Sequence, residues 1–280
     1  MGEAGILLVA QRLAPAPEQA RRLLACVREN AENPACELMS GSPGTMLAAQ
    51  ALHERTGDEL WAAAWRESAD WLWAQWRGEV WEQELSGRRL RILGPAHGFA
   101  GIVAVLARGR LLDDARRSEL ERRVVAVAGA SAQRAAGLAQ WPSSHPARPG
   151  GSLRTQWCHG APGMVTSLAG LAPGDDELSE LLAAGGELTW RAGPLAKGPG
   201  LCHGTAGNGY ALLKLFERTG DEHWLARARA FAMHTAGQVE RERQTHGRGR
   251  HTLWTGDLGA ALYLGSCIAG TASMPTLDVL

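Results

Sequence analysis

The sequence lacks a net charge, because 29 Lys and Arg residues balance 29 Asp and Glu residues over its 280 residues. Binding to nucleic acid or to an anionic membrane depends on excess positive charge, so neither partner is expected. The chain also has no apolar run of about 18 residues, the length that a membrane-spanning helix needs. Its acidic N-terminus does not read as a signal peptide. These absences predict a cytoplasmic protein without a membrane span.

Aromatic residues and cysteines are also few. The chain has two Tyr, three Phe and five Cys, and the Cys have no regular spacing. A β-rich protein uses more aromatic residues, whereas the abundant Ala, Leu and Arg favour helices. An odd number of Cys argues against a disulfide framework. Cys beside His in a reducing compartment is more often metal-binding or catalytic.

A Gly-x-x-Gly turn recurs along the chain, and each copy leads into a short apolar stretch and then a longer amphipathic one. A helix that is apolar all round needs cover on several sides, whereas an amphipathic helix contacts water with one face. We therefore predict an all-α fold, an (α/α) toroid with inner and outer helices, as a single domain over residues 1–280. All turns would then meet at one end of the ring.

The pattern gives approximate bounds for these helices. The six expected inner helices cover residues 6–10, 45–53, 102–107, 164–171, 208–216 and 260–269. The five expected outer helices cover residues 17–30, 59–76, 116–136, 175–190 and 222–239. Residues 143–151 and 244–251 are expected to be loops, because they are rich in Pro and Gly or in polar residues.

Two of the turns carry the same metal-binding residue types. Residues 157–163 are Trp-Cys-His-Gly-Ala-Pro-Gly, and residues 201–207 are Leu-Cys-His-Gly-Thr-Ala-Gly. Cys158 and Cys202 are one repeat apart, and the toroid would bring both to one face. Two thiolates and one imidazole, with a fourth position open, describe a catalytic Zn²⁺ site. The duplication leaves open whether His159 or His203 is the third ligand.

Such a site can hold an incoming thiol in its ionised form, although a free thiol, with a pKa near about 8.5, is mostly protonated at neutral pH. Addition of that thiolate to an electron-poor alkene gives an enolate that must be protonated. His97, in the related turn Ala-His-Gly-Phe-Ala-Gly, is the expected proton donor. Arg154, four residues before Cys158, is a candidate for holding the enolate oxygen. The alternatives are a core His and a surface Arg.

These three turns together resemble the lanthionine synthetase C-like family over almost the whole chain. The likeness is nearer to its eukaryotic-type, glutathione-binding branch than to the lanthipeptide cyclases. Cys-His-Gly at residues 158–160 and Lys-Gly-Pro-Gly-Leu-Cys-His-Gly at residues 197–204 carry this distinction. The resemblance implies a toroid of seven inner and seven outer helices. Because six inner helices are expected here, we expect the first N-terminal hairpin of the family to be missing and the ring to be open.

The resemblance also implies a set of site residues. Zn²⁺ would be held by Cys158, Cys202 and His203, with His159 outside the ligand set but beside the substrate. The resemblance implies catalytic roles for two further residues, His97 and Arg154. It also implies a substrate-binding position for Lys197, at glutathione, and for Glu37, which stands where the cyclases have an Asp.

The activity that the resemblance implies is zinc-promoted addition of a thiol to dehydroalanine or dehydrobutyrine in a peptide or protein. In the glutathione-binding branch, the thiol is glutathione. Two alternatives stay open. One is a zinc- and glutathione-binding protein without turnover, and the other is a cyclase that forms lanthionine in a ribosomal precursor peptide.

Overall fold

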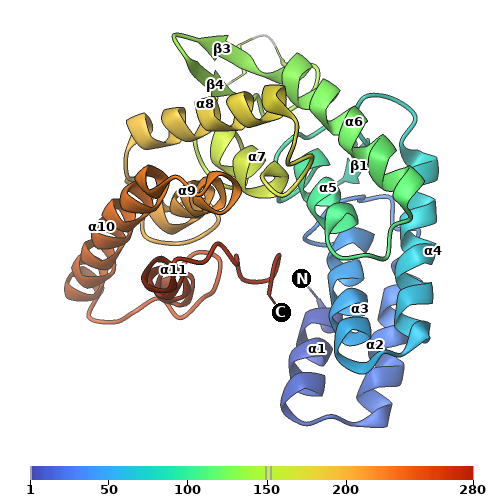
Figure 1. The fold of residues 1–280 in the computed structure, drawn as a ribbon. Coiled ribbons are helices and arrows are strands. Elements are labelled where there is room, and N and C mark those ends of the chain that lie inside the picture. Colours follow the sequence, from blue (N-terminus) through green and yellow to red (C-terminus); the bar gives the residue numbers. More distant parts are fainter. Residues whose placement is uncertain (1, 149, 152, 280) are drawn as a thin grey trace.

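The computed structural model describes residues 2–148, 150–151 and 153–279, which form eleven helices and two short β-hairpins (Figure 1). The helices before the middle of the chain are α1 (Glu3–Leu13), α2 (Pro17–Glu29), α3 (Ser42–Thr56), α4 (Glu59–Gln75), α5 (Phe99–Ala107) and α6 (Asp114–Ser131). Those after it are α7 (Ala161–Leu168), α8 (Asp176–Ala192), α9 (Thr205–Thr219), α10 (Glu222–His246) and α11 (Asp257–Ala269). The hairpins are β1–β2 (Gln83–Leu85 and Arg88–Leu90) and β3–β4 (Gln133–Ala135 and Leu138–Gln140).

The helices follow an arc and alternate between its inside and its outside (Figure 1). Helices α3, α5, α7, α9 and α11 lie inside, and each contacts the next along the arc. Helices α4, α6, α8 and α10 cover them from outside. The difference in burial agrees with this order: every residue of α7 is buried, whereas α8 buries only one face. The predicted layers of inner and outer helices are therefore present.

The inner helices begin earlier than the apolar pattern predicts, because the glycine turn forms the start of each helix. The residue directly before each of these five helices is a glycine: Gly41, Gly98, Gly160, Gly204 and Gly256. The second glycine lies against the chain that enters the turn. A Cβ at Gly163 would lie 1.9 Å from the carbonyl oxygen of Trp157, and a Cβ at Gly207 would lie 1.8 Å from that of Leu201. Only glycine allows this close approach.

The C-terminal ends of the outer helices α6 and α10 differ from the prediction. Helix α6 ends at Ser131, because residues 133–140 form a hairpin around Ala136 and Gly137, which have φ values of 50° and 75°. Two successive positive φ angles are typical of the two-residue turns that connect antiparallel strands. Helix α10 continues to His246, and Gly247 with a φ of 66° ends it, so the first part of the predicted loop 244–251 is helical.

The N-terminal helix α1 differs from the other helices that follow a glycine turn. None of its residues is buried, and Ile6, Val9 and Leu13 are 73%, 57% and 80% exposed. A Cβ at Gly2 or Gly5 would meet no atom within 4 Å, so the close packing seen at the other turns does not occur here. Helix α1 contacts α2 and α3, and its partly buried residues Ala4, Leu7 and Leu8 pack against the core.

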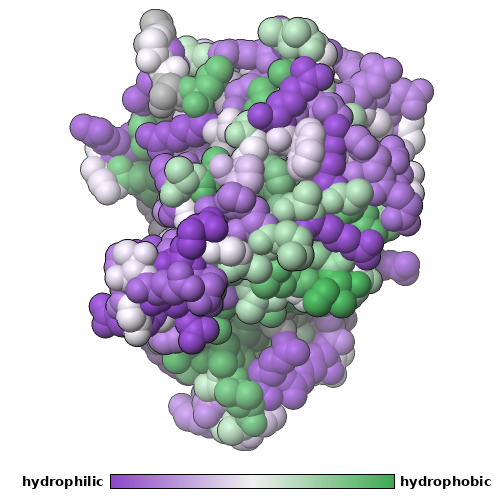
Figure 2. Space-filling view, turned by 90° about the vertical axis from the view of Figure 1, so that its left-hand side faces the viewer, coloured by the Kyte–Doolittle hydropathy of each residue, from purple (hydrophilic) through white to green (hydrophobic). Residues whose placement is uncertain are grey.

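Helix α11, near the other end of the arc, also exposes apolar side chains. Leu258, Leu262 and Ile268 are all largely accessible. Figure 2 shows that hydrophobic surface gathers in the lower half of the face seen from the left of Figure 1. Among the described residues, no helix is both long and apolar enough to cross a membrane.

The C-terminal segment lies inside the arc. It crosses the C-terminal ends of the inner helices, opposite to the glycine turns. Met274 is buried there, and Asp278 lies 3.2 Å from the ammonium group of Lys214 in α9. Arg108, at the end of α5, donates to the carbonyl oxygen of Leu277. Through these contacts the C-terminal segment covers one end of the layer of inner helices, and the glycine turns lie at the opposite end.

Candidate metal centre

Backbone hydrogen bonds join the turns that precede the inner helices. The N–H of Cys158 donates to the carbonyl oxygen of Cys202 at 3.1 Å, and the N–H of Cys202 donates to that of Trp254 at 2.8 Å. The turn before α5 lies against the same group, because a Cβ at Gly94 would be 2.2 Å from the carbonyl oxygen of Cys158. Turns that are far apart in the sequence are therefore held at one end of the ring.

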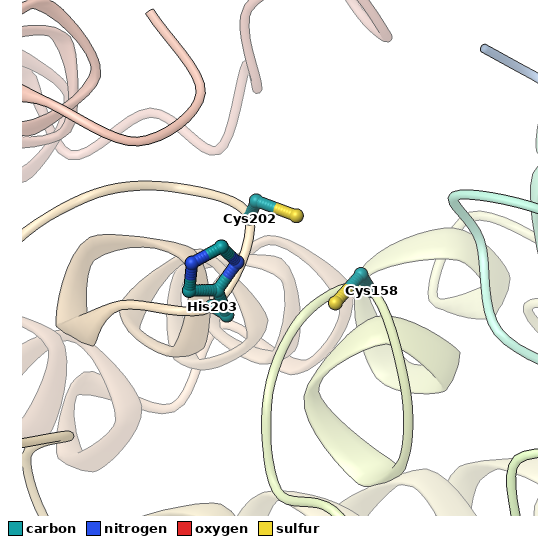
Figure 3. A group of neighbouring side chains, drawn as sticks. All are labelled: Cys158, Cys202 and His203. Carbon is teal, nitrogen blue, oxygen red and sulfur yellow. The ribbon is translucent and has the colours of Figure 1, made fainter. Parts of the chain in front are cut away.

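Cys158, Cys202 and His203 converge at this end. Their possible ligand atoms all lie within 4.8 Å of one another. Figure 3 shows that Cys158 comes from one loop and the other two residues from a second loop, and that the two sulfur atoms and the imidazole face a common space. Two thiolates and an imidazole form a zinc site with one position open for a further ligand. His159 is not a member of this group.

The two thiols shift each other's pKa in opposite directions, because they share a hydrogen bond. A hydrogen bond from Cys202 lowers the pKa of Cys158 to about 7, and a 3.0 Å hydrogen bond from Gln156 acts in the same direction. The hydrogen bond to Cys158, together with burial, raises the pKa of Cys202 well above its ordinary value. Two thiolates at this distance repel each other unless a cation lies between them. Zn²⁺ accepts this donor set, so the residues fit the ion.

The imidazole of His203 is in the form that a metal ligand requires. Its pKa is lowered by burial and by the nearby charges of Lys197 and Arg250. A neutral imidazole has a free nitrogen lone pair, and metal ligands bind in that form. Two cations therefore lie close to His203.

A second pair, His97 and Glu37, lies beside the metal group. Nδ1 of His97 is 2.8 Å from Oε2 of Glu37, and the Glu37 side chain is fully buried. The charge of Cys158 reaches His97 and contributes to its raised pKa, after the larger effect of the Glu37 hydrogen bond. The carboxylate of Glu37 accepts hydrogen bonds from His97 and from the N–H groups of residues 39–41. The substrate-binding position that the resemblance implies for Glu37 stays a prediction.

His159 lies near the charges of both Arg154 and His97. Burial, followed by the charges of Arg154 and His97, lowers the pKa of His159 to about 4. Its imidazole is therefore neutral at physiological pH and lies near both cations. Arg154 is exposed, and its backbone carbonyl packs under the turn, where a Cβ at Gly160 would be 1.8 Å from its oxygen.

Sequence reasoning missed Gln156 and Arg250. Gln156 is buried next to Cys158, and Lys197 donates to its side-chain oxygen at 3.1 Å. Arg250 lies in the turn before α11, where its backbone N–H donates to Asp257. The signal that was available is the position of Gln156, two residues before Cys158 in the first Cys-His-Gly turn.

The model of the family described as lanthionine synthetase C-like protein matches residues 2–279. The chain belongs to the lanthionine synthetase C-like family. It is 36% identical over 145 residues to the zebrafish (Danio rerio) protein named "Glutathione S-transferase LANCL1". It is 44% identical over 80 residues to the Arabidopsis thaliana "LanC-like protein GCL1".

These two matches cover only part of this lanthionine synthetase C-like chain and a smaller part of each relative. The zebrafish match covers 50% of the chain and 34% of the relative, and the plant match covers 28% and 18%. A solved structure of nisin cyclase superposes with a TM-score of 0.72 and 17% sequence identity, over 99% of this chain and 78% of that chain. This likeness confirms the predicted (α/α) toroid fold.

Proposed function

We propose that the protein adds a thiol, most simply glutathione, to dehydroalanine or dehydrobutyrine residues of a peptide or protein. The observation that carries the proposal is the group Cys158, Cys202 and His203 next to His97 at one end of the ring. The name of the zebrafish relative, a glutathione S-transferase, supports glutathione as the thiol. Membership of the family supports chemistry of this general kind.

The metal-binding residues would prepare the thiol. Cys158, Cys202 and His203 would hold Zn²⁺, which, when bound, supplies a Lewis acid that keeps an incoming thiol ionised near neutral pH. The lowered pKa of His203 and the distances of at most 4.8 Å between the three possible ligand atoms suit these side chains to a metal. The proton of the incoming thiol leaves to water.

His97 would complete the addition. The thiolate sulfur bonds to the β-carbon of the acceptor, the π electrons of the alkene move towards the carbonyl group, and the α-carbon takes up a proton. Because Glu37 engages Nδ1 of His97, Nε2 is the atom that can donate. The Glu37 hydrogen bond raises the pKa of His97, which favours the protonated form that can donate. The sum is thiol plus alkene to thioether, and it needs no oxidant or reductant.

The cations around the site would bind and orient the substrates. Glutathione carries two carboxylates, and Lys197 lies close enough to the metal group to lower the pKa of His203. Arg154 lies close enough to His159 to lower its pKa. We assign Lys197 to a carboxylate of glutathione and Arg154 to the carbonyl oxygen of the acceptor, where negative charge develops.

The test is an incubation of the zinc-loaded protein with glutathione and a peptide that contains one dehydroalanine. Mass spectrometry should show the peptide gaining the mass of one glutathione faster than in a mixture without protein. The matched control is Cys267→Ser, which changes a buried Cys of α11 and should react like the wild type, whereas Cys202→Ser should not. No adduct above the uncatalysed rate would exclude the addition. If glutathione nevertheless binds to that protein, binding without turnover is the function.

A further inference from the structure

Gln156 stands between a charged side chain and a metal-binding sulfur. Lys197 Nζ donates to Oε1 of Gln156 at 3.1 Å, and Nε2 of Gln156 donates to Sγ of Cys158 at 3.0 Å. The orientation of the amide follows from this arrangement. An ammonium group can only donate, so the amide oxygen must face Lys197 and the amide nitrogen must face the sulfur.

The side chain is also held in place by its surroundings. Gln156 is buried, and its backbone pairs with that of His159 through two hydrogen bonds of 3.1 and 3.0 Å. Its position is therefore fixed within the same turn that carries Cys158. A buried amide with both ends bonded is a rigid element, and the loss of one partner would leave a buried polar atom without a hydrogen bond.

We propose that Gln156 is a positioning residue that orients Cys158 and withdraws electron density from its sulfur, with Lys197 as its anchor. The inference deepens the proposed function, on which it rests for the identity of the metal. An N–H donated to a thiolate stabilises its negative charge, and the charge of Lys197 polarises the amide further.

This arrangement would keep the ligand sulfur from reacting. The site must let a guest thiolate attack an electron-poor alkene while its own cysteines, which are also thiolates, stay bound. A thiolate that accepts a hydrogen bond is a weaker nucleophile, so the hydrogen bond from Gln156 protects Cys158 from alkylation. Removing the donor should therefore weaken metal binding and expose Cys158 to electrophiles.

The test uses Gln156→Leu, which removes the donor at similar volume, and Gln156→Glu, which places an acceptor at the same position. The Zn²⁺ dissociation constant is measured by competition with a chromophoric chelator, and both variants should bind about 10–100-fold more weakly, as is typical when a partner of a metal ligand is lost. With Co²⁺ in place of Zn²⁺, the sulfur-to-metal charge-transfer band should shift to longer wavelength. Zinc-loaded Gln156→Leu should also be alkylated faster at Cys158 by N-ethylmaleimide.

The matched control is Gln50→Leu. Gln50 is also buried, but it lies in α3 and donates to Glu54. This variant should keep the wild-type dissociation constant and Co²⁺ spectrum. Lys197→Met should change the same measurements in the same direction as Gln156→Leu, but by less. Lys197→Arg keeps the positive charge and should give the wild-type values. Circular dichroism shows whether a Gln156 variant folds. If it does not, the comparison of Lys197→Met with Lys197→Arg decides the question, because Lys197 is exposed and its substitution leaves the core intact.

Unchanged zinc affinity within twofold, together with an unchanged Co²⁺ spectrum, would overturn the role of Gln156. None of these measurements contains glutathione or a dehydroalanine peptide, so that result would leave the proposed thiol addition standing. A wild-type protein that binds no Zn²⁺ would overturn both proposals.

Discussion

Nδ1 of His97 lies 2.8 Å from Oε2 of Glu37, although 60 residues separate them in the chain. Burial alone would raise the pKa of Glu37, but hydrogen bonds from His97, Ser40 and Met39 lower it, so the carboxyl group is ionised. In turn, the hydrogen bond from the imidazole to this carboxylate raises the pKa of His97. Glu37 thus orients the imidazole of His97 through Nδ1, which leaves Nε2 for the proton transfer that we propose.

The first prediction concerns Glu37→Gln. A neutral amide removes the main cause of the raised pKa of His97, so that pKa should fall. The proton-donating form of His97 is lost as the pH rises through its pKa. The alkaline limb of the pH–rate profile for glutathione addition should therefore move to lower pH.

The control for this variant is Glu187→Gln, which changes a carboxylate of α8 that pairs with Arg227 on the outside of the ring. It should leave the pH–rate profile in place. An alkaline limb that stays at the wild-type pH in Glu37→Gln would show that His97 does not titrate in the rate-determining step.

The second prediction concerns His97→Gln. The loss of a general acid should lower the rate of addition by about 10²–10⁴-fold. His97 lies outside the group Cys158, Cys202 and His203, so the zinc content should remain at the wild-type level. The rate is followed by mass spectrometry and the zinc content by elemental analysis. A variant that reacts as fast as the wild type would exclude His97 as the proton donor.

The duplicated turns predicted which two sulfurs meet, but they left the third ligand open. His159 and His203 follow a Cys at the same place in equivalent turns, so the repeat alone treats them alike. The resemblance to the family implied His203, and the structure brings that residue to the two sulfurs. His159 differs because its turn faces the turn of His97 and the charge of Arg154, which the repeat does not reveal.

The sequence also did not predict the contact between Glu37 and His97, for a related reason. The bond between Glu37 and His97 depends on how one turn is placed against the next, and nothing in either turn states that placement. The alternation of inner and outer helices was easier to predict, because burial requires an apolar or an amphipathic pattern. The β3–β4 hairpin was missed because an Ala-Gly pair is a weaker turn signal than Asn-Gly.

The third prediction concerns Cys202→Ser. A hydroxyl is a poor replacement for a thiolate that holds zinc, so the variant should contain little or no zinc after purification and dialysis. The matched control is Cys267→Ser, in which another buried Cys is replaced in α11. That variant should retain the wild-type zinc content in elemental analysis. Full zinc occupancy in Cys202→Ser would contradict the assignment of this Cys as a ligand.

The fourth prediction concerns Gly207→Ala, at the turn that carries Cys202 and His203. A Cβ at this position would lie 1.8 Å from the carbonyl oxygen of Leu201, so backbone atoms must move. We expect the variant to lose about 2 kcal/mol or more of its free energy of unfolding, in the upper part of the usual range for single substitutions. Urea denaturation of the metal-free protein measures this difference.

The matched control for Gly207→Ala is Gly265→Ala, also within an inner helix. A Cβ at Gly265 would meet no atom within 4 Å, so the substitution should stabilise α11 by about 0.5–1 kcal/mol through the higher helix propensity of Ala. Opposite signs for the same chemical change would show that the glycine turn, rather than glycine content, determines stability. If Gly207→Ala unfolds at the urea concentration of the wild type, the turn is not as closely packed as described, and the positions of Cys202 and His203 lose their explanation.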